Sequence, residues 1–244
     1  MSDVTTVSTA TVGRPSLALD HLVVAAATLD QGVAWCEQVL GHAPQAGGRH
    51  AFMGTHNRIL SIASARFPRA YLEVIAIDPA KQPTRAAGLH RWFDLDDATL
   101  QAELAQHGPR LIHFVARVPD AAAALHALAA GPTPIDRGPL VEASRDTAAG
   151  RLDWKISVRD DGQRLFYGAL PTVIEWGPVH PADTMPASGI TLTELHATHP
   201  RPEMLHAAHA ALGLAQVPVE AGPPNLVAVL QTPHGHVTLE SKGI

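Results

Sequence analysis

Apolar and polar positions along the chain follow an order that repeats. The segment LALDHLVV at 17–24 is apolar and strand-like, and TLDQGVAWCEQVLG at 28–41 carries apolar residues at helical spacing. Thr28 and Gln31 have the spacing of a capping box, and Gly41 has the position of a helix terminator. The pattern therefore predicts a strand followed by a helix.

The same strand and helix pattern recurs twice. RLIHFVARV at 110–118 precedes PDAAAALHALAAG at 119–131, and GITLTELHATHP at 189–200 precedes RPEMLHAAHAALG at 201–213. Three more strand-like segments follow each helix, and those of the third copy are short. A period of roughly 80–90 residues is typical of a duplicated module and too long for a solenoid of short repeats.

Each copy thus has the order β-α-β-β-β, with the last copy abbreviated, and the chain is predicted to be an α+β protein. The predicted boundaries are a disordered lead at 1–16, a first module with a linking helix at 17–108, a second module at 109–187 and a partial third module at 188–244. The third module is expected to pack on the same fold, where it either extends the sheet or forms a dimer contact.

Composition narrows the class of protein. Of the 244 residues 46% are hydrophobic and 17% are charged, and the formal net charge is −5. This gives no basic field for nucleic acid or anionic lipid, and no apolar run approaches the roughly 18–20 residues of a membrane helix. The single cysteine, Cys36, excludes an internal disulfide and fits a reducing cytoplasm. We expect a cytoplasmic homodimer with a small-molecule substrate and with neither nucleic acid nor membrane as partner.

Four ionisable residues lie where apolar ones would be expected. His21 and His113 lie in the first strands of the first two copies, and the other face of the second of these strands is wholly apolar. Glu73 lies in YLEVIAI and Glu175 lies in LPTVIEW, where an ionised carboxylate is costly unless a cation or hydrogen-bond donors meet it. Asp20 is expected to face away from His21, because neighbouring residues of a strand face opposite sides.

Two imidazoles and two carboxylates at repeat-related positions predict a mixed nitrogen and oxygen metal site. Such a set leaves open positions on a divalent ion, with Ni, Co, Zn, Mn and Fe(II) as the candidates. The ion could polarise two neighbouring substrate oxygens, and a carboxylate that leaves the ion could act as a base. Glu175 and Glu73 are the candidate catalytic bases, and the sequence does not rank them.

The chain also resembles a known family. The residues LDHLVVAAATLDQGVAWCEQVLG, GGRHAFMGTHNRIL, YLEVIAIDP and RWFDLD are similar to those of glyoxalase-like domain proteins in the vicinal-oxygen-chelate superfamily. The resemblance implies paired βαβββ modules that form a curled mixed sheet around a cleft. It also implies metal ligands on the first and last strands of each module, which here are His21, Glu73, His113 and Glu175, as in bacterial metal-dependent glyoxalase I.

Substrate-binding residues are suggested by weaker signals. The family keeps a Gly-Thr-x-Asn core, which implies that Thr55 and Asn57 touch the cleft, although a turn is the simpler reading. Arg49 could anchor an anionic substrate, as could Arg58 and Arg151, although surface arginines are common. Trp92 is a candidate for the cleft wall, with Trp154 and Trp176 as further candidates.

The favoured function is a metal-dependent lyase or isomerase of the glyoxalase type, acting on a small oxygen-rich substrate that chelates the metal through two atoms. One alternative is an Fe(II) extradiol-type dioxygenase, which needs two histidines and one glutamate from the same four positions. The other alternative is a protein that binds a small ligand without metal. The sequence contains no P-loop, no G-x-S-x-G, no H-E-x-x-H and no C-x-x-C motif, which argues against nucleotide chemistry.

Overall fold

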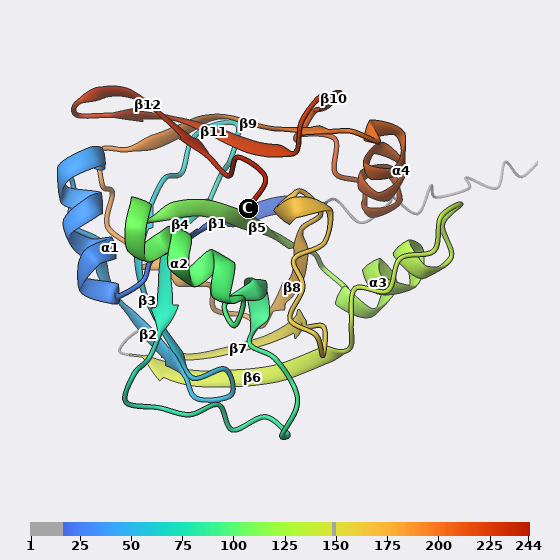
Figure 1. Cartoon of the computed structure of the whole chain (residues 1–244), viewed down its shortest axis with the longest axis horizontal. Coiled ribbons are helices and arrows are strands. Elements are labelled where there is room, and N and C mark those ends of the chain that lie inside the picture. The colour runs from blue at the N-terminus through green and yellow to red at the C-terminus, as the bar shows by residue number, and fades with distance from the viewer. Residues whose placement is uncertain (1–16, 148–149) are drawn as a thin grey trace, which may run out of the picture.

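A computed structural model describes residues 17–147 and 150–244, and the predicted disordered lead at 1–16 lies outside them. Strands between residues 18 and 176 form one curled eight-stranded sheet, around which the helices are arranged (Figure 1). In spatial order its strands are β2 (Gln45–His50), β3 (Thr55–Ser61), β4 (Tyr71–Ile77), β1 (Ala18–Ala25), β5 (Arg110–Arg117), β8 (Thr172–Trp176), β7 (Gly150–Ser157) and β6 (Leu140–Thr147).

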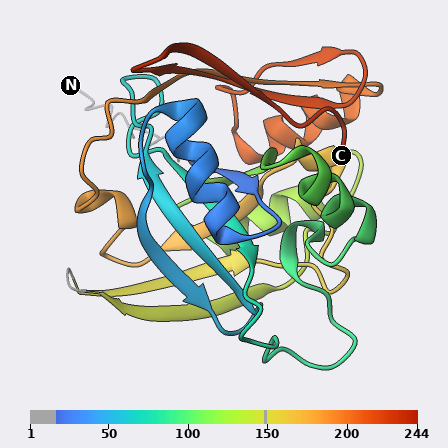
Figure 2. The same ribbon diagram turned by 60° about the vertical axis from the view of Figure 1, so that its left-hand side comes forward.

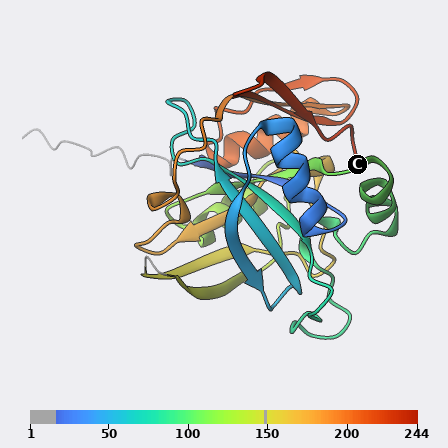
Figure 3. The same cartoon turned by 90° about the vertical axis from the view of Figure 1, so that its left-hand side faces the viewer.

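The sheet consists of two copies of one unit. In the first, β1 pairs in parallel with β4, and in the second β5 pairs in parallel with β8. The antiparallel pair of β1 and β5 joins the two copies at the centre of the sheet. From there both halves curl away, so that the edge strands β2 and β6 approach the same side of the molecule (Figures 2 and 3). The prediction of an α+β fold with paired βαβββ modules and a curled mixed sheet is confirmed.

The helices begin and end close to where the sequence signals place them. They are α1 (Leu29–Trp35), which continues as the π-helical turn Cys36–Leu40, α2 (Ala98–His107), α3 (Ala121–Ala129) and α4 (Pro202–Leu212). Thr28 caps α1 by accepting a hydrogen bond from the Gln31 amide at 3.1 Å, and Gly41 follows with a φ of 75°. Asp120 caps α3 in the same way through the Ala123 amide at 2.9 Å.

The C-terminal segment forms a second sheet of four strands, which lies above the curled sheet in Figure 1. In spatial order these are β10 (Val219–Ala221), β9 (Thr191–His199), β11 (Asn225–Thr232) and β12 (Gly235–Glu240). It does not extend the first sheet but packs on its convex face. Its strand order also differs from that of the modules, since β9 takes as its parallel partner the strand directly after its helix.

Two apolar clusters fill the two faces of the curled sheet. On the convex face Leu22 and Phe114 pack in one cluster with α1, α3, α4 and residues of the second sheet such as Leu226. On the concave face Val23 and Ile174 pack with residues of α2. The helix α2 therefore closes part of the concave side, and the rest of that side carries the polar residues described next. None of the helices in 17–147 or 150–244 is long and apolar enough to cross a membrane.

Candidate functional site

A bulge in β1 brings two neighbouring residues to one side of the strand. In the pairing with β5, Leu19 lies opposite Ala116 and His21 lies opposite Val115, so that Asp20 is the extra residue. The Asp20 carboxylate consequently contacts the ring of the next residue, with 2.7 Å between its Oδ1 and His21 Nδ1. The prediction that Asp20 faces away from His21 is therefore wrong, because it assumed unbroken alternation.

The other side of the His21 ring faces Glu73 on the neighbouring strand β4. His21 Nε2 lies 3.6 Å from Glu73 Oε2, which is too long for a hydrogen bond. The two atoms are close enough for a single atom of a bound molecule to contact both. The Asn57 amide donates a hydrogen bond of 2.5 Å to Glu73 Oε1. Asn57 Oδ1 in turn accepts from the Gly48 amide at 2.6 Å. Glu73 is thus buried with one oxygen held by Asn57 and the other turned toward His21.

Asp20 is the centre of a buried polar network. Its Oδ2 accepts hydrogen bonds from His180 Nε2 at 2.8 Å and from the Trp176 indole at 3.0 Å. Burial raises the pKa of the Asp20 carboxyl, but the hydrogen bonds from His180 and His21 outweigh this, and the pKa lies well below its ordinary value. Asp20 is therefore ionised, and it accepts the Nδ1 proton of His21. The other ring nitrogen of His21, Nε2, then faces Glu73.

Tyr71 stacks on His21 with ring centroids 4.6 Å apart. Burial raises the pKa of the Tyr71 phenol well above its ordinary value, and the charges of Asp20 and Glu73 raise it further. Burial also lowers the pKa of His50, at the end of β2, to about 4, despite the opposing charge of Glu73. Both side chains are therefore neutral near pH 7.

His21, His50 and Tyr71 line a narrow inner cavity on the concave side of the sheet. Its volume is about 50 Å³, and its walls include His21, Asn57, Glu73, Trp92 and Arg145. Trp154 and Trp176 also line it, with ring centroids 5.5 Å apart. A wider outer cavity of about 610 Å³ lies between β2 and β6. Arg145 lines both cavities, as do Ile59 and Pro181, so the two cavities adjoin there.

His113 takes part in a different set of contacts. Its Nδ1 contacts the Gly168 carbonyl at 2.8 Å, and its Nε2 accepts from the Thr172 amide at 3.1 Å. The buried Arg137 guanidinium lies 3.3 Å from the same Nε2. Burial lowers the pKa of His113 well below its ordinary value, and the positive charge of Arg137 lowers it further. His113 is therefore a neutral structural histidine whose two ring nitrogens already have partners.

Glu175 lies on the opposite face of the sheet from Glu73. Its Oε2 accepts a hydrogen bond of 2.8 Å from the Ala121 amide at the start of α3, and its Oε1 lies 3.3 Å from Lys155 Nζ. The strand register explains this. Val23 pairs with Glu73, whereas Val115, the equivalent of Val23 in the second module, pairs with Thr172. Thr172 therefore stands at the place of Glu73, and Glu175, an odd number of residues further, faces the helix.

The four predicted metal ligands accordingly do not converge. His21 and Glu73 face each other, whereas His113 is saturated by hydrogen bonds and Glu175 stabilises the start of α3. In the described part of the chain, no three His, Cys, Asp or Glu side chains are arranged to hold one ion. The donor set of this chain therefore does not fit the four-ligand site that the resemblance implies, nor the two histidines and one glutamate of an extradiol-type iron site.

The four predicted substrate-binding residues have different positions. Asn57 and Trp92 line the inner cavity. Thr55 is buried beneath it, where its Oγ1 lies 3.0 Å from His50 Nδ1. Arg49 is paired with Asp78 at 2.5 Å, and its side chain is mostly exposed.

Sequence reasoning missed several residues that contribute to the site, among them Tyr71 and His50 of the inner cavity. His180 and Arg145 come from loop and strand positions with no local signal, and Asp20 was noted but assigned to the wrong face. A polar pair next to a bulge cannot be recognised by alternation. The doublet Gly47–Gly48 was a usable signal, because each glycine makes room for a side chain of the site, Asn57 and Arg145 respectively.

Comparisons with known proteins agree with this architecture. A model of the glyoxalase-like domain matches residues 19–213, and the chain belongs to this family. A solved structure of a hypothetical protein from Staphylococcus aureus is similar, with a TM-score of 0.55, 12% identity, and coverage of 92% of this chain and 84% of that one. No curated protein matches the chain.

Two characterised structures are more distant. Methylmalonyl-CoA epimerase from Mycobacterium tuberculosis has 18% identity and a TM-score of 0.38, with coverage of 66% of this chain and 88% of that one. A mutant of 4-hydroxymandelate synthase from Streptomyces coelicolor has 13% identity and a TM-score of 0.43, with coverage of 93% of this chain and 63% of that one.

Proposed function

We propose that this chain is an isomerase or lyase that acts on a small oxygen-rich substrate. It would remove a proton from the carbon atom beside a carbonyl group and return it to the same or another substrate atom. One observation carries the proposal, namely the chain of contacts Asp20, His21, Glu73 and Asn57, of which the last three line the inner cavity. It combines a carboxylate with an imidazole of fixed tautomer, which are the groups that general acid and base catalysis uses.

Glu73 is the base in this proposal. Asn57 holds one carboxylate oxygen, so the other is free to approach a substrate C–H bond. His21 Nε2 lies 3.6 Å from that oxygen, and it can take up the proton or return it to another substrate atom. Asp20 stabilises the imidazolium that forms in between, since its ionised carboxylate contacts His21 Nδ1. No step of this sequence passes through a metal ion.

The proposal differs from the metal-dependent enzyme that the sequence favours. The fold and family are the same, but the ligand set of this chain is incomplete, and the base is assigned to Glu73 rather than left open between Glu73 and Glu175. Binding of a ligand without chemistry is the competing function, since a tryptophan-lined cavity serves binding equally well.

Deuterium exchange tests the proposal. Pyruvate, 2-oxobutanoate and the uncharged dihydroxyacetone are incubated with the protein in D₂O, and loss of the C–H signals beside the carbonyl is followed by proton NMR. We expect catalysed exchange with at least one compound, and a loss on the order of 10²- to 10⁴-fold in Glu73→Gln, which is the range of general base catalysis.

Glu175→Gln is the matched control, because it makes the same chemical change on the other face of the sheet. It should exchange at the rate of the unaltered protein, before and after dialysis against EDTA. The proposal fails if none of the three compounds exchanges above the uncatalysed rate, and binding without chemistry is then the better description. It also fails if Glu73→Gln retains full activity.

A further inference from the structure

Two buried hydrogen-bond donors at the inner cavity have no partner among the described residues. They are Nε1 of Trp92 and Nε of Arg145, and both side chains line the cavity that Glu73 lines. An indole N–H and a guanidinium can only donate hydrogen bonds. Buried donors without partners are uncommon in native proteins. Of the six buried side-chain nitrogens without a partner in the described residues, these two belong to residues that line the inner cavity, where a bound ligand can supply the acceptor.

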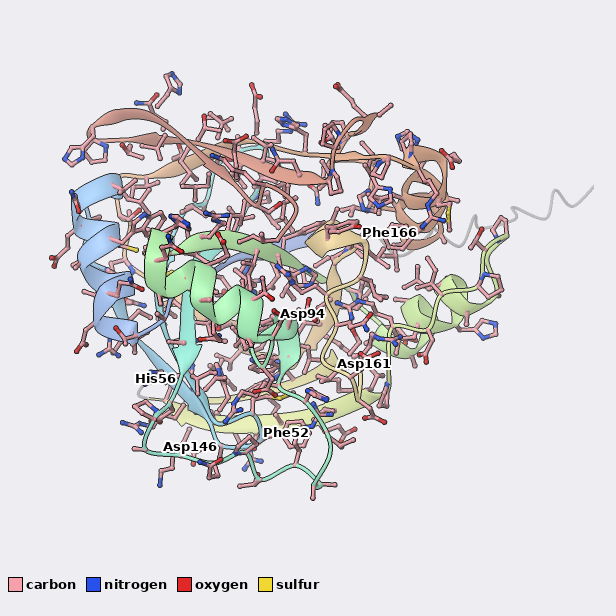
Figure 4. The ribbon with its side chains drawn as sticks, viewed as in Figure 1. Phe52, His56, Asp94, Asp146, Asp161 and Phe166 are labelled. Carbon is pink, nitrogen blue, oxygen red and sulfur yellow. The ribbon has the colours of Figure 1, made fainter. Side chains whose placement is uncertain are left out.

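Arg145 is one of the arginines without an acidic partner in the described part of the chain, whereas many others are paired. Arg49, Arg69, Arg91, Arg151, Arg159 and Arg164 each form an ion pair with an aspartate. The Arg145 side chain forms no hydrogen bond or ion pair with any described residue, although Glu73 lines the inner cavity and Asp146 the outer one. Figure 4 labels Asp146, the next residue, at the lower edge of the molecule. The guanidinium is thus a half-buried positive charge without a counterion at the junction of the two cavities.

The fold makes space for this guanidinium at one particular residue. A Cβ atom at Gly48 of β2 would lie 1.3 Å from Arg145 Nη1, so that only glycine leaves room for the guanidinium on the strand. The contact joins the two edge strands, β2 and β6, across the mouth of the curled sheet. The position of Arg145 is therefore determined by the backbone of the opposite edge strand.

We propose that Arg145, assisted by Trp92, binds a carboxylate group of the substrate at the mouth of the inner cavity. The inference rests on the proposed function and defines its substrate class as a small oxo acid. An anion on Arg145 places the neighbouring carbon atoms in the inner cavity, whose volume of about 50 Å³ admits only a few atoms. The rest of a larger substrate would extend into the outer cavity. A planar guanidinium suits a carboxylate, because two parallel hydrogen bonds can form.

Ligand binding can be measured without any reaction. Trp92, Trp154 and Trp176 all line the inner cavity, so binding should quench tryptophan fluorescence. The probes are 2-oxobutanoate and its methyl ester, which differ in the negative charge. The unaltered protein should bind the acid more tightly than the ester, and Arg145→Gln should weaken binding of the acid on the order of 10- to 100-fold while binding of the ester changes little.

Two further variants separate a direct contact from a general effect on the fold. Gly48→Ala should also weaken binding of the acid, because its methyl group displaces the end of a flexible side chain. Arg151→Gln is the control, since Arg151 lies on the neighbouring strand β7, is exposed and pairs with Asp153 at 2.8 Å. It should bind both probes as the unaltered protein does, and circular dichroism should show all three variants folded.

The inference is overturned if the unaltered protein binds acid and ester equally or binds neither, or if Arg145→Gln keeps the preference for the acid. Failure of the proposed function has a different signature, because deuterium exchange would then be absent while the preference for the acid remained. Exchange with dihydroxyacetone but no preference for the acid would support the proton transfer and reject the carboxylate site.

Discussion

At the scale of single residues, the environment of each histidine decides its role. His21 and His113 occupy equivalent positions of two repeated units, yet one faces a carboxylate and the other faces Arg137. His113 Nε2 must therefore remain an acceptor, and a proton there would meet a positive charge. The sequence predicts equal roles for the two, since it does not show which loop returns to cover each strand.

The stability of the protein should therefore depend on pH through His113. Its folded-state pKa lies below the unfolded value of 6.5, so the unfolded chain binds more protons, and stability is complete above pH 6.5 and is lost as the pH falls. The test is urea unfolding of the unaltered protein and of His113→Gln at pH 8, 6 and 5. At pH 8 the free energy of unfolding of His113→Gln should be lower by about 1–3 kcal/mol, because the Gly168 carbonyl loses its hydrogen-bond donor.

The same variant should lose less stability between pH 8 and pH 5 than the unaltered protein does. The pH dependence of the stability should become weaker in the variant but should not vanish, because His50, with a pKa of about 4, also destabilises the folded protein as the pH falls. An equally steep loss in both proteins would contradict the assignment of His113 as a buried neutral group.

At the scale of elements, one strand register separates the two glutamates. Alternation predicts which residues of a strand share a face, but it does not predict which residue of β8 pairs with Val115. The sequence placed Glu175 at the position that Thr172 occupies. In β1 the residue that alternation misplaced is Asp20, and there the cause is a single bulge. Helix caps such as Thr28 and Asp120 were predictable because each depends on contacts within a few residues.

The contact between β8 and α3 predicts a purely structural role for Glu175. Its carboxylate accepts from the first amide of α3, where a negative charge also interacts favourably with the helix dipole. Glu175→Ala should lower the free energy of unfolding by about 0.5–2 kcal/mol, as loss of a helix cap does. Asp120→Ala, at the same helix end, should cost a similar amount in the same thermal or urea unfolding measurement.

Loss of activity in Glu175→Ala at a temperature where the variant is fully folded would contradict this role. It would indicate that the carboxylate takes part in the reaction.

At the scale of the whole molecule, the second sheet belongs to the same core as the first. Residues of β9, β11 and β12 pack in one cluster with residues of β1 and β5 on the convex face. Phe166, labelled in Figure 4, adds a contact, since its ring centroid lies 5.3 Å from that of His199 in β9. The sequence predicted that 188–244 packs on the same fold, but the short strands alone could not show that they form a separate sheet.

A shared core implies that both sheets unfold together. Leu226 of β11 is fully buried in the common cluster, and Leu226→Ala should cost about 2–5 kcal/mol. All four tryptophans, at positions 35, 92, 154 and 176, precede the second sheet, so fluorescence reports on the curled sheet while far-ultraviolet circular dichroism reports on both. The two signals should shift together to lower urea concentration in the variant. If the circular dichroism transition moves while the fluorescence transition stays, the second sheet is an independent unit. The cleft would then be supported by the paired modules alone.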